Sequence, residues 1–379
     1  MKYSFRLFIL LISLWSCSFN KTKMDSADQL LNVSENSLDA NYFRSHFEVA
    51  EIIPIQTNDT ILISDIKKVI RYKNKIILLS GAQGHVFIID ATTGRFEGEI
   101  NKRGRGPGES RKILDIAFYE ELEQIIIFND YSKLLFFDIE GEYLYEEEVG
   151  ELFEEISLYD DEVVFYNKLD GYSCYPYVLR FFNIKEKKWR NKGKDVKIDF
   201  HIRSQGRNLV KSKQLWFTAP LDYSLFVFKN NQICNPIKLD ISEYALNEDL
   251  IKLSISDPLA FFKEVNGNSL IYSLNSIRET SNHLVFKSNQ KGVFIINKND
   301  NVVYWDKHDN GQSMLSSKYY YPHEGDDEKI MFIIPAHEYV NNAETTLKNN
   351  IGAPGIKEED NPILIFFKEK ENVKNTSKN

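Results

Sequence analysis

Short runs of apolar residues recur along this chain of 379 residues, and each run ends in a polar residue. Six runs share the pattern: VFIID at 86–90, LLFFD at 134–138, LRFFN at 179–183, LFVFK at 225–229, VFIIN at 293–297 and LIFFK at 364–368. From start to start, the intervals are 48, 45, 46, 68 and 71 residues. A repeat in the mid-forties that is built from β-strands is typical of propeller blades.

Further strands flank these runs. Five runs follow closely on another apolar stretch, and five precede a short polar turn (ATTG, IEGE, IKEK, NNQ or KNDN) that leads into one more strand. Asn, Gly and Asp adopt positive φ in such turns at low cost. Each unit is therefore expected to be an antiparallel sheet of four strands: an inner strand, a middle pair and an outer strand.

The last unit lacks an outer strand, whereas the apolar segment at 47–57 (FEVAEIIPIQT) has no unit of its own. An unpaired sheet edge favours aggregation, so pairing of these two parts is the economical solution. We predict an all-β fold, a six-bladed β-propeller of four-stranded blades whose N-terminal strand completes the sixth blade and closes the ring.

The two long intervals contain extra sequence at 242–265 and 335–360, with periodicity that is compatible with short helices. In a propeller, the loops between blades and the loops between second and third strands emerge on the same face. Both inserts fall in such loops, and long loops on a rigid scaffold often bind ligands. The alternative is that the helices only cover blade edges.

The first residues have the order of a processing signal. Lys2 and Arg6 are basic, and residues 7–15 form an apolar segment too short to cross a bilayer as a mature helix. The following Ser16-Cys17 resembles the lipobox of bacterial lipoproteins. That resemblance implies cleavage after residue 16 and lipidation of Cys17, which would anchor the protein to a membrane. An ordinary signal peptide with a chance cysteine is the alternative.

These boundaries predict four segments: a signal peptide at 1–16, a lipidated cysteine with a flexible tether at 17–45, the propeller at 46–370 and a disordered tail at 371–379. The tether is expected to be flexible because its sequence is polar and its apolar residues do not recur at a regular spacing. Cys174 and Cys234 are then the remaining cysteines, and we expect two free thiols rather than a disulfide.

The formal net charge of the chain is −8. Removal of residues 1–16 changes it to −10, because Lys2 and Arg6 are lost. An acidic protein lacks the clustered cations that nucleic-acid phosphates require. We therefore expect no nucleic-acid partner, and a link to the membrane through the lipid alone.

A glycine-rich segment, NKRGRGPGE at 101–109, joins the first unit to the second. It resembles the G-x-G-P-G-E signature of the six-bladed β-propeller lipoproteins of Bacteroidetes, which are relatives of NHL-type propellers. The closing segment at 361–367 and the lipobox extend this resemblance over most of the chain. The resemblance implies the fold and a cell-envelope location more firmly than any reaction.

The charged residues of this segment are candidates for ligand binding. Arg103, Arg105 and Arg111 lie beside Glu109 at the expected channel mouth, where guanidinium groups could clamp a carboxylate or a sugar acid. The alternative is that they bind loop carbonyls and lock adjacent blades. The spacing of the glycines is not that of a dinucleotide-binding loop.

Other candidates follow from the same strand assignment. Asp65 and Asp115 both begin inner strands, so equivalent carboxylates are expected near the central channel, where they could act as acid and base or hold Ca²⁺. The favoured alternative is that each carboxylate caps a strand or pairs with a loop arginine. His201 and Arg203, together with Arg207, lie in the loop from the third to the fourth unit.

No arrangement in the sequence identifies a catalytic site or a metal site. The seven histidines show no metal-ligand spacing, and there is no G-x-S-x-G motif. We therefore predict no catalytic residues and no cofactor, with Ca²⁺ in the channel as the one candidate ion. The expected function is that of a lipid-anchored envelope module that binds a peptide, glycan or protein, either in the periplasm or at the cell surface.

Two alternatives stay open. Six-bladed propellers also include metal-dependent enzymes of the lactonase and lyase type with a site at the channel mouth, and a fold does not determine a function. A structural subunit of an envelope complex is the other alternative.

Overall fold

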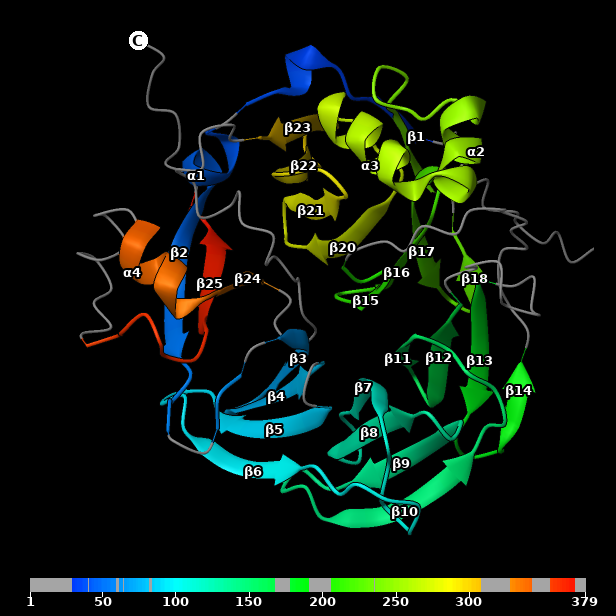
Figure 1. Cartoon of the computed structure of the whole chain (residues 1–379), viewed down its shortest axis with the longest axis vertical. Coiled ribbons are helices and arrows are strands. Elements are labelled where there is room, and N and C mark those ends of the chain that lie inside the picture. Colours follow the sequence, from blue (N-terminus) through cyan, green and yellow to red (C-terminus); the bar gives the residue numbers. More distant parts are fainter. Residues whose placement is uncertain are drawn as a thin grey trace, which may run out of the picture.

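The computed structural model describes residues 29–39, 41–58, 61–63, 65–81, 84–167, 178–190, 206–234, 236–307, 328–342 and 355–371. Within these residues, six β-sheets surround a central axis as the blades of a propeller (Figure 1). The predicted six-bladed fold is therefore confirmed.

The first three blades each have four antiparallel strands in chain order from the axis outward. Blade 1 contains β3 (Ile66–Tyr72), β4 (Lys75–Ser80), β5 (His85–Asp90) and β6 (Phe96–Ile100). Blade 2 contains β7 (Ile113–Tyr119), β8 (Gln124–Asn129), β9 (Lys133–Phe137) and β10 (Tyr143–Glu148). Blade 3 contains β11 (Glu155–Tyr159), β12 (Glu162–Tyr166), β13 (Leu179–Asn183) and β14 (Lys188–Arg190).

The next two blades follow the same plan, and blade 4 has additional strands at its outer edge. Blade 4 contains β15 (Leu209–Lys211), β16 (Leu215–Ala219), β17 (Asp222–Lys229), β18 (Gln232–Ile233) and β19 (Ile237–Asp240). Blade 5 contains β20 (Leu274–Glu279), β21 (His283–Ser288), β22 (Val293–Asn297) and β23 (Val302–Asp306).

The two ends of the propeller sequence meet in blade 6. Its described strands are β24 (Lys329–Ile334), β25 (Ile363–Glu369) and β2 (Phe47–Pro54). β2 runs antiparallel to β25, with Phe47 opposite Glu369 and Pro54 opposite Ile363. The N-terminal strand therefore closes the ring, as the unpaired apolar segment at 47–57 predicted.

The apolar runs are continuous because each middle strand is covered on both faces by neighbouring blades. In β9, Leu135 and Phe137 pack into the core between blades 1 and 2, whereas Leu134 and Phe136 pack into the core between blades 2 and 3. Successive side chains of a strand point to opposite faces, so a strand between two cores is apolar at every position. The core of the protein thus consists of layers between blades.

The turns after five of the runs have the predicted backbone conformation. Each contains a residue at positive φ: Gly94, Gly141, Lys187, Asn231 and Asn301. Glycine and asparagine adopt this conformation readily, which explains four of the turns, whereas in the turn IKEK a lysine adopts it.

The structure describes residues 29–39 and 41–46 of the segment before the propeller. β1 (Gln29–Asn32) pairs in parallel with β19, and Leu31 and Val33 are buried in the core of blades 4 and 5. The prediction of a flexible tether over 17–45 is therefore wrong for its second half. The reason is that two apolar side chains at alternate positions reach a core that other parts of the chain create.

The same segment continues along the outer edge of blade 5. It forms the short 3₁₀-helix η1 (Glu35–Ser37) and then α1 (Tyr42–His46), whose Tyr42 and Phe43 are buried in the core of blades 5 and 6. The backbone N–H of Phe43 donates a hydrogen bond of 3.0 Å to Asp306 at the end of β23. Residues 1–28, and with them Cys17, lie outside the described residues, as do residues 372–379 of the predicted tail.

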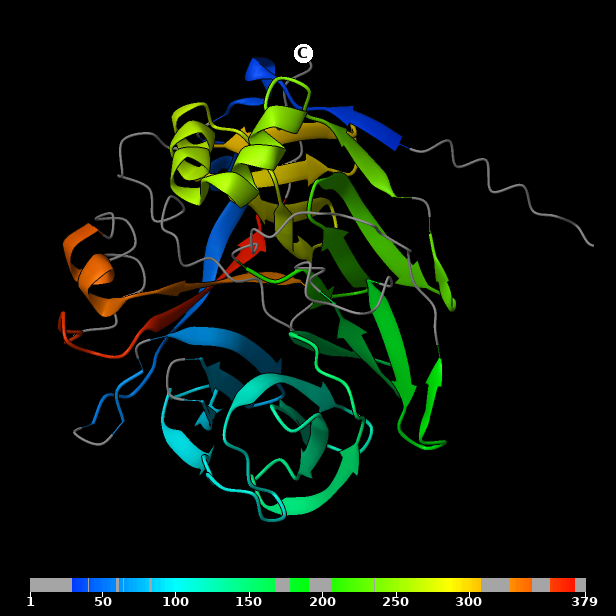
Figure 2. The ribbon, with the colours of Figure 1, turned by 45° about the vertical axis from the view of Figure 1, so that its right-hand side comes forward.

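Both inserts contain helices, as predicted. α2 (Glu248–Ser256) and α3 (Pro258–Gly267) lie between blades 4 and 5, and α4 (Ala336–Asn342) lies between β24 and β25. All three helices are on the same side of the ring (Figure 2). Phe261 and Val265 of α3 are buried against Tyr272, which precedes β20, so one face of this insert packs next to the start of blade 5.

Candidate functional site

Four buried charged residues meet in the centre of the channel. They come from the first three inner strands and from the loop before β15, and none is more than 4% exposed; we call Lys68, Asp115, Glu155 and Arg207 the central cluster. The guanidinium of Arg207 donates two hydrogen bonds to the Asp115 carboxylate, at 2.9 and 2.6 Å. This bidentate pair joins blade 2 to the loop that leads into blade 4.

The other charged groups of the central cluster are also hydrogen-bonded. Lys68 Nζ donates to the backbone carbonyls of Ile116 and Ile156, at 2.7 and 2.9 Å. Glu155 Oε2 accepts hydrogen bonds of 2.9 Å from the backbone N–H groups of Asn208 and Leu209. The central cluster thus fastens inner strands together by charged hydrogen bonds.

The charges around Asp115 control its ionisation. Burial by itself raises the pKa of this carboxyl, but the positive charges of Arg207 and Lys68 outweigh burial and lower the pKa to about 2. A carboxylate with so low a pKa is a poor proton acceptor at neutral pH. Asp115 therefore pairs with an arginine of a loop, Arg207, which is one of the alternatives that the sequence offered.

Asp65 does not occupy the position equivalent to Asp115. It is exposed and precedes β3, and the residue of β3 that corresponds to Asp115 is Lys68. Both inner strands have an irregular register after their first residue, and this shift cannot be read from the pattern of apolar residues. The prediction of two equivalent carboxylates in the channel is therefore wrong.

The glycine-rich loop before β7 is organised by its own glutamate. Glu109 accepts a hydrogen bond of 2.8 Å from the backbone N–H of Gly106, and a Cβ added at Gly104 would lie 1.9 Å from Glu109 Oε2. Gly108 has φ +71°, and a Cβ added there would lie 2.6 Å from the ring of Tyr143 in blade 2. The glycines therefore allow the loop to close over the Glu109 carboxylate.

The arginines of this loop lie on the surface. Arg111 Nε donates a hydrogen bond of 2.9 Å to Asp130, and its guanidinium lies 5.9 Å from the centre of the Tyr131 ring. Arg103 and Arg105 are exposed. The structure does not bring these arginines together with Asp115.

Three other residues singled out in the sequence, His201, Arg203 and Cys174, lie outside the described residues. Cys234 is a half-buried free thiol.

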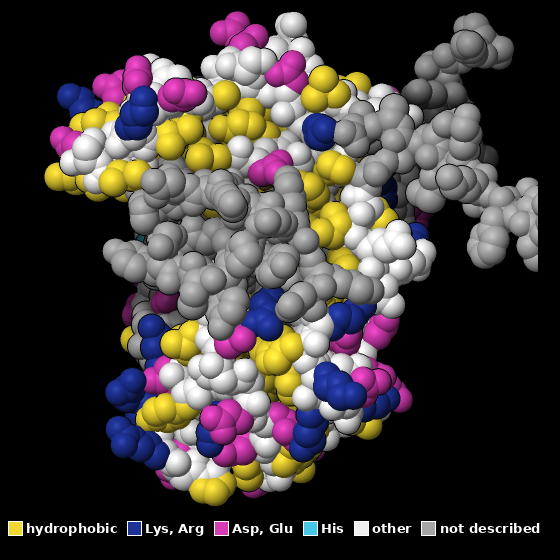
Figure 3. Space-filling model, turned by 90° about the vertical axis from the view of Figure 1, so that its right-hand side faces the viewer, with side chains coloured by type: hydrophobic (Ala, Val, Ile, Leu, Met, Phe, Trp, Pro, Cys, Tyr) yellow, Lys and Arg dark blue, Asp and Glu magenta, His cyan; other side chains and the backbone are white. Residues whose placement is uncertain are grey.

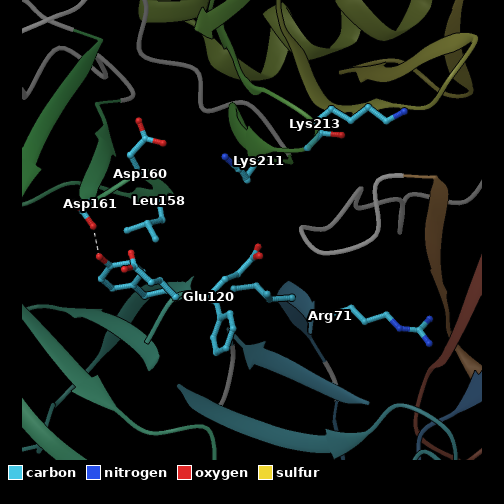
Figure 4. Close-up of a pocket in the computed structure, with 12 residues that line it drawn as sticks. Arg71, Glu120, Leu158, Asp160, Asp161, Lys211 and Lys213 are labelled. Atoms are coloured by element: carbon cyan, nitrogen blue, oxygen red, sulfur yellow. Dashed lines mark hydrogen bonds between the residues drawn. The ribbon is translucent and has the colours of Figure 1, made fainter. Parts of the chain in front are cut away.

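A cavity of about 630 Å³ opens at the other mouth of the channel (Figure 4). It lies where the inner strands of blades 1 to 4 end, whereas the inserts and the glycine-rich loop lie where inner strands begin. Its lining residues are Ile70, Arg71, Phe118, Tyr119, Glu120, Glu121, Leu158, Asp160, Asp161, Lys211, Ser212 and Lys213. We call this cavity the mouth pocket.

The cations of the mouth pocket are engaged. Arg71 makes a bidentate pair with Glu51 at 2.6 and 3.0 Å, and Lys213 makes an ion pair of 2.5 Å with Glu328. Lys211 lies 5.5 Å from the centre of the Tyr159 ring.

The acidic residues of the mouth pocket fall into two groups. Asp161 pairs with Lys185 at 2.9 Å and accepts a hydrogen bond from the Tyr119 hydroxyl, and these contacts lower its pKa. Among the described residues, no salt bridge involves Glu120, Glu121 or Asp160, which we call the mouth carboxylates. Within the described part of the chain, the mouth pocket therefore has three carboxylates that form no salt bridge.

Sequence reasoning missed these residues, although a signal exists. In blades 2 and 3 the inner strand ends in a tyrosine that is followed by two acidic residues, Tyr119-Glu120-Glu121 and Tyr159-Asp160-Asp161. A motif repeated at equivalent places in two blades is more informative than either copy alone.

In the part of the chain that the structure describes, no group of three or more His, Cys, Asp or Glu side chains could hold a metal ion. Within the same ranges, no helix combines the length and the apolar character needed to cross a bilayer.

Comparison with known protein families gives a match over nearly the whole chain. The model of the family described as "Domain of unknown function (DUF4934)" matches residues 31–368. The chain belongs to the DUF4934 family. No curated protein has a sequence that matches it.

The fold of this DUF4934 chain is similar to two crystal structures from Bacteroides. A Bacteroides fragilis protein named as exported has 15% identity and a TM-score of 0.71, over 90% of this chain and 99% of the other. A DUF4221 protein of Bacteroides vulgatus has 13% identity and a TM-score of 0.52, over 86% and 98%. At such low identity the likeness shows the fold alone. Together with the family match, it supports the predicted relationship to Bacteroidetes propellers.

Proposed function

We propose that this protein is an exported, lipid-anchored module of the cell envelope that binds a polypeptide partner without catalysis. In this proposal, lysine or arginine side chains of the partner bind in the mouth pocket. The signal sequence, with Cys17 after its apolar segment, supports export and anchoring. The similarity in fold to a Bacteroides protein named as exported is consistent with that location.

The observation that carries the proposal is the unequal pairing of charges in the mouth pocket. Its arginine and one of its lysines are paired with carboxylates, whereas the mouth carboxylates have no salt-bridge partner among the described residues. A lysine or arginine side chain of a partner would form salt bridges with the mouth carboxylates. A pocket of about 630 Å³ is large enough for a few side chains.

The pocket also has features that suit a peptide. Phe118, Tyr119 and Leu158 provide apolar surface next to the acidic residues. Long basic side chains combine an apolar stem with a charged end, so they match a lining of this kind.

The metal-dependent alternative has less support. Such a site needs several ligands that converge on an ion, but the buried acidic residues of the channel are bound to cations and to backbone N–H groups. Asp115 and Glu155 therefore serve as structural links between blades in this proposal.

The test uses the full-length protein and a fluorescein-labelled peptide of alternating lysine and glycine, with fluorescence anisotropy as the measurement. We expect the Glu120→Gln/Glu121→Gln variant to bind this peptide about three- to tenfold more weakly, because each lost ion pair contributes up to roughly 1 kcal/mol. Asp160→Asn should have a smaller effect of the same sign, and its amide tolerates the positive φ of 51° at this position.

The matched control is Glu140→Gln/Glu186→Gln. Both glutamates are exposed in turns of blades 2 and 3 outside the pocket, so this variant has the same change in net charge. Equal weakening by the two variants would show that only the overall charge attracts the peptide, and the proposed site would be wrong.

A further inference from the structure

Large apolar side chains are exposed unevenly around the propeller. Ten are exposed among the described residues, and six of them lie on the N-terminal segment, the α2–α3 insert or the outer strand of blade 5: Leu30, Leu38, Ile255, Leu259, Phe262 and Val302. We call this surface the apolar rim. Leu259 is 84% exposed and Leu30 65% exposed. Apolar side chains gather in the upper part of the view in Figure 3. Single exposed leucines are ordinary, but a group on one sector indicates an interaction.

The helices of the α2–α3 insert are held in place by capping hydrogen bonds and by a buried side chain. The side chains of Asn247 and Asp257 cap α2 and α3, accepting hydrogen bonds of 2.9 and 3.1 Å from backbone N–H groups. Phe261 anchors α3 and is fully buried, whereas the neighbouring Phe262 is 36% exposed. Ile255, Leu259 and Phe262 are therefore not needed to fill the core of this insert.

The chain enters the propeller in the same sector. β1 is the outermost strand of blade 4, and the insert follows directly on its partner β19 (Figure 1). Gln29 lies twelve positions after Cys17, and twelve extended residues span at most about 40 Å. A lipid attached to Cys17 therefore restrains the apolar rim to the neighbourhood of the bilayer surface.

We infer that the apolar rim docks onto the lipid bilayer that carries the anchor, with the side chains of the α2–α3 insert in the interfacial region. This inference rests on the lipid anchoring in the proposed function. Apolar side chains at a bilayer surface add to the binding of an acyl anchor, and they also fix an orientation that the anchor alone leaves free. The rim of blades 4 and 5 then faces the membrane, and the mouth pocket opens to the aqueous side of the protein.

The experiment uses full-length lipidated protein in vesicles of phosphatidylethanolamine and phosphatidylcholine, some with brominated acyl chains. Tryptophan is introduced as Leu259→Trp or Leu30→Trp, and the signal of the parent protein is subtracted. Bromine close to the headgroups should quench the new tryptophan about two- to threefold more strongly than in the control, because interfacial side chains lie roughly 5–10 Å into the headgroup and acyl boundary. The control is Leu144→Trp, an exposed leucine in blade 2 that is 43% accessible.

The outcomes separate the two proposals. Flotation of the vesicles tests the anchor: protein that stays at the bottom of the gradient would overturn both the anchoring and this inference. Protein that floats, but shows equal quenching at Leu259→Trp, Leu30→Trp and Leu144→Trp, would overturn the docking of the rim and leave the anchor intact. Because all three leucines are exposed, the substitutions should leave the fold unchanged, which circular dichroism verifies.

Discussion

The centre and the mouth of the channel use the same types of residue for different purposes. In the central cluster, lysine, arginine and acidic side chains are buried and bind one another or the backbone. At the mouth, where inner strands end, the mouth carboxylates have no salt-bridge partner among the described residues, and the neighbouring Arg71 and Lys213 are paired with carboxylates outside the pocket. The comparison teaches that burial and pairing, rather than residue type, decide whether a charged side chain holds blades together or stays at the surface of the channel mouth.

The largest expected effect is at the centre. Arg207→Met removes the cation that binds Asp115, so two acidic residues would remain buried with less compensation. The free energy of unfolding should fall by about 3–5 kcal/mol, because breaking a buried ion pair leaves an uncompensated charge. Urea denaturation measures this. A change as small as that of Arg105→Met, an exposed arginine, would contradict the structural role of the central cluster.

Acid should weaken the same cluster. The pKa of Asp115 is about 2 in the folded protein and 3.8 as a free group, so its ionised form stabilises the fold above pH 3.8, and this contribution is lost as the pH falls toward 2. The stability difference between the parent protein and Asp115→Asn should therefore shrink by about 2 kcal/mol over that range. Urea denaturation at several pH values measures it. A constant difference would show that Asp115 is not held ionised by its neighbours.

A third buried carboxylate sharpens the comparison because its pKa moves the other way. Burial raises the pKa of Asp306 to about 7, despite its hydrogen bond from Phe43 N–H and the charge of Arg44. The folded protein therefore binds a proton here that the unfolded chain releases, and stability falls as the pH rises from 3.8 through 7.

Asp306→Asn keeps an oxygen acceptor for Phe43 and removes the buried charge. We expect this variant to have a higher Tm than the parent protein at pH 8, and the gain should disappear toward pH 4. Thermal unfolding followed by circular dichroism gives both values. A lower Tm of the variant at pH 8 would show that the ionised carboxylate stabilises the attachment of α1.

The smallest expected effect on stability is at the mouth. Glu120→Gln/Glu121→Gln should change the free energy of unfolding by less than about 0.5 kcal/mol, because exposed substitutions away from buried networks have little effect. The same variant should weaken the binding of the cationic peptide. A marked loss of stability would mean that the mouth carboxylates belong to the framework of the fold and not to a binding site.

The sequence predicted much of the architecture and little of the site. The apolar runs predicted the blades, the polar turns predicted the positive φ of Gly94 and Asn301, and the unpaired segment at 47–57 predicted the closing strand β2. These features depend on local periodicity. Failures occurred where one residue of register mattered, as for Asp65 and Lys68, and where a polar segment hid two apolar side chains, as for Leu31 and Val33.

What the sequence by itself determined is the repeat, and therefore the number of blades, the closure of the ring and the face that carries the helical inserts. Such features follow from alternation and spacing within short stretches of chain. Only the tertiary structure decided which charged residues meet. Arg207 and Asp115 are 92 positions apart and lie in different blades, so their pairing depends on the closed ring and on the register of β7. The mouth carboxylates have no salt-bridge partner among the described residues for the complementary reason, since the ends of four inner strands converge there while Arg71 and Lys213 bind acidic residues outside the pocket.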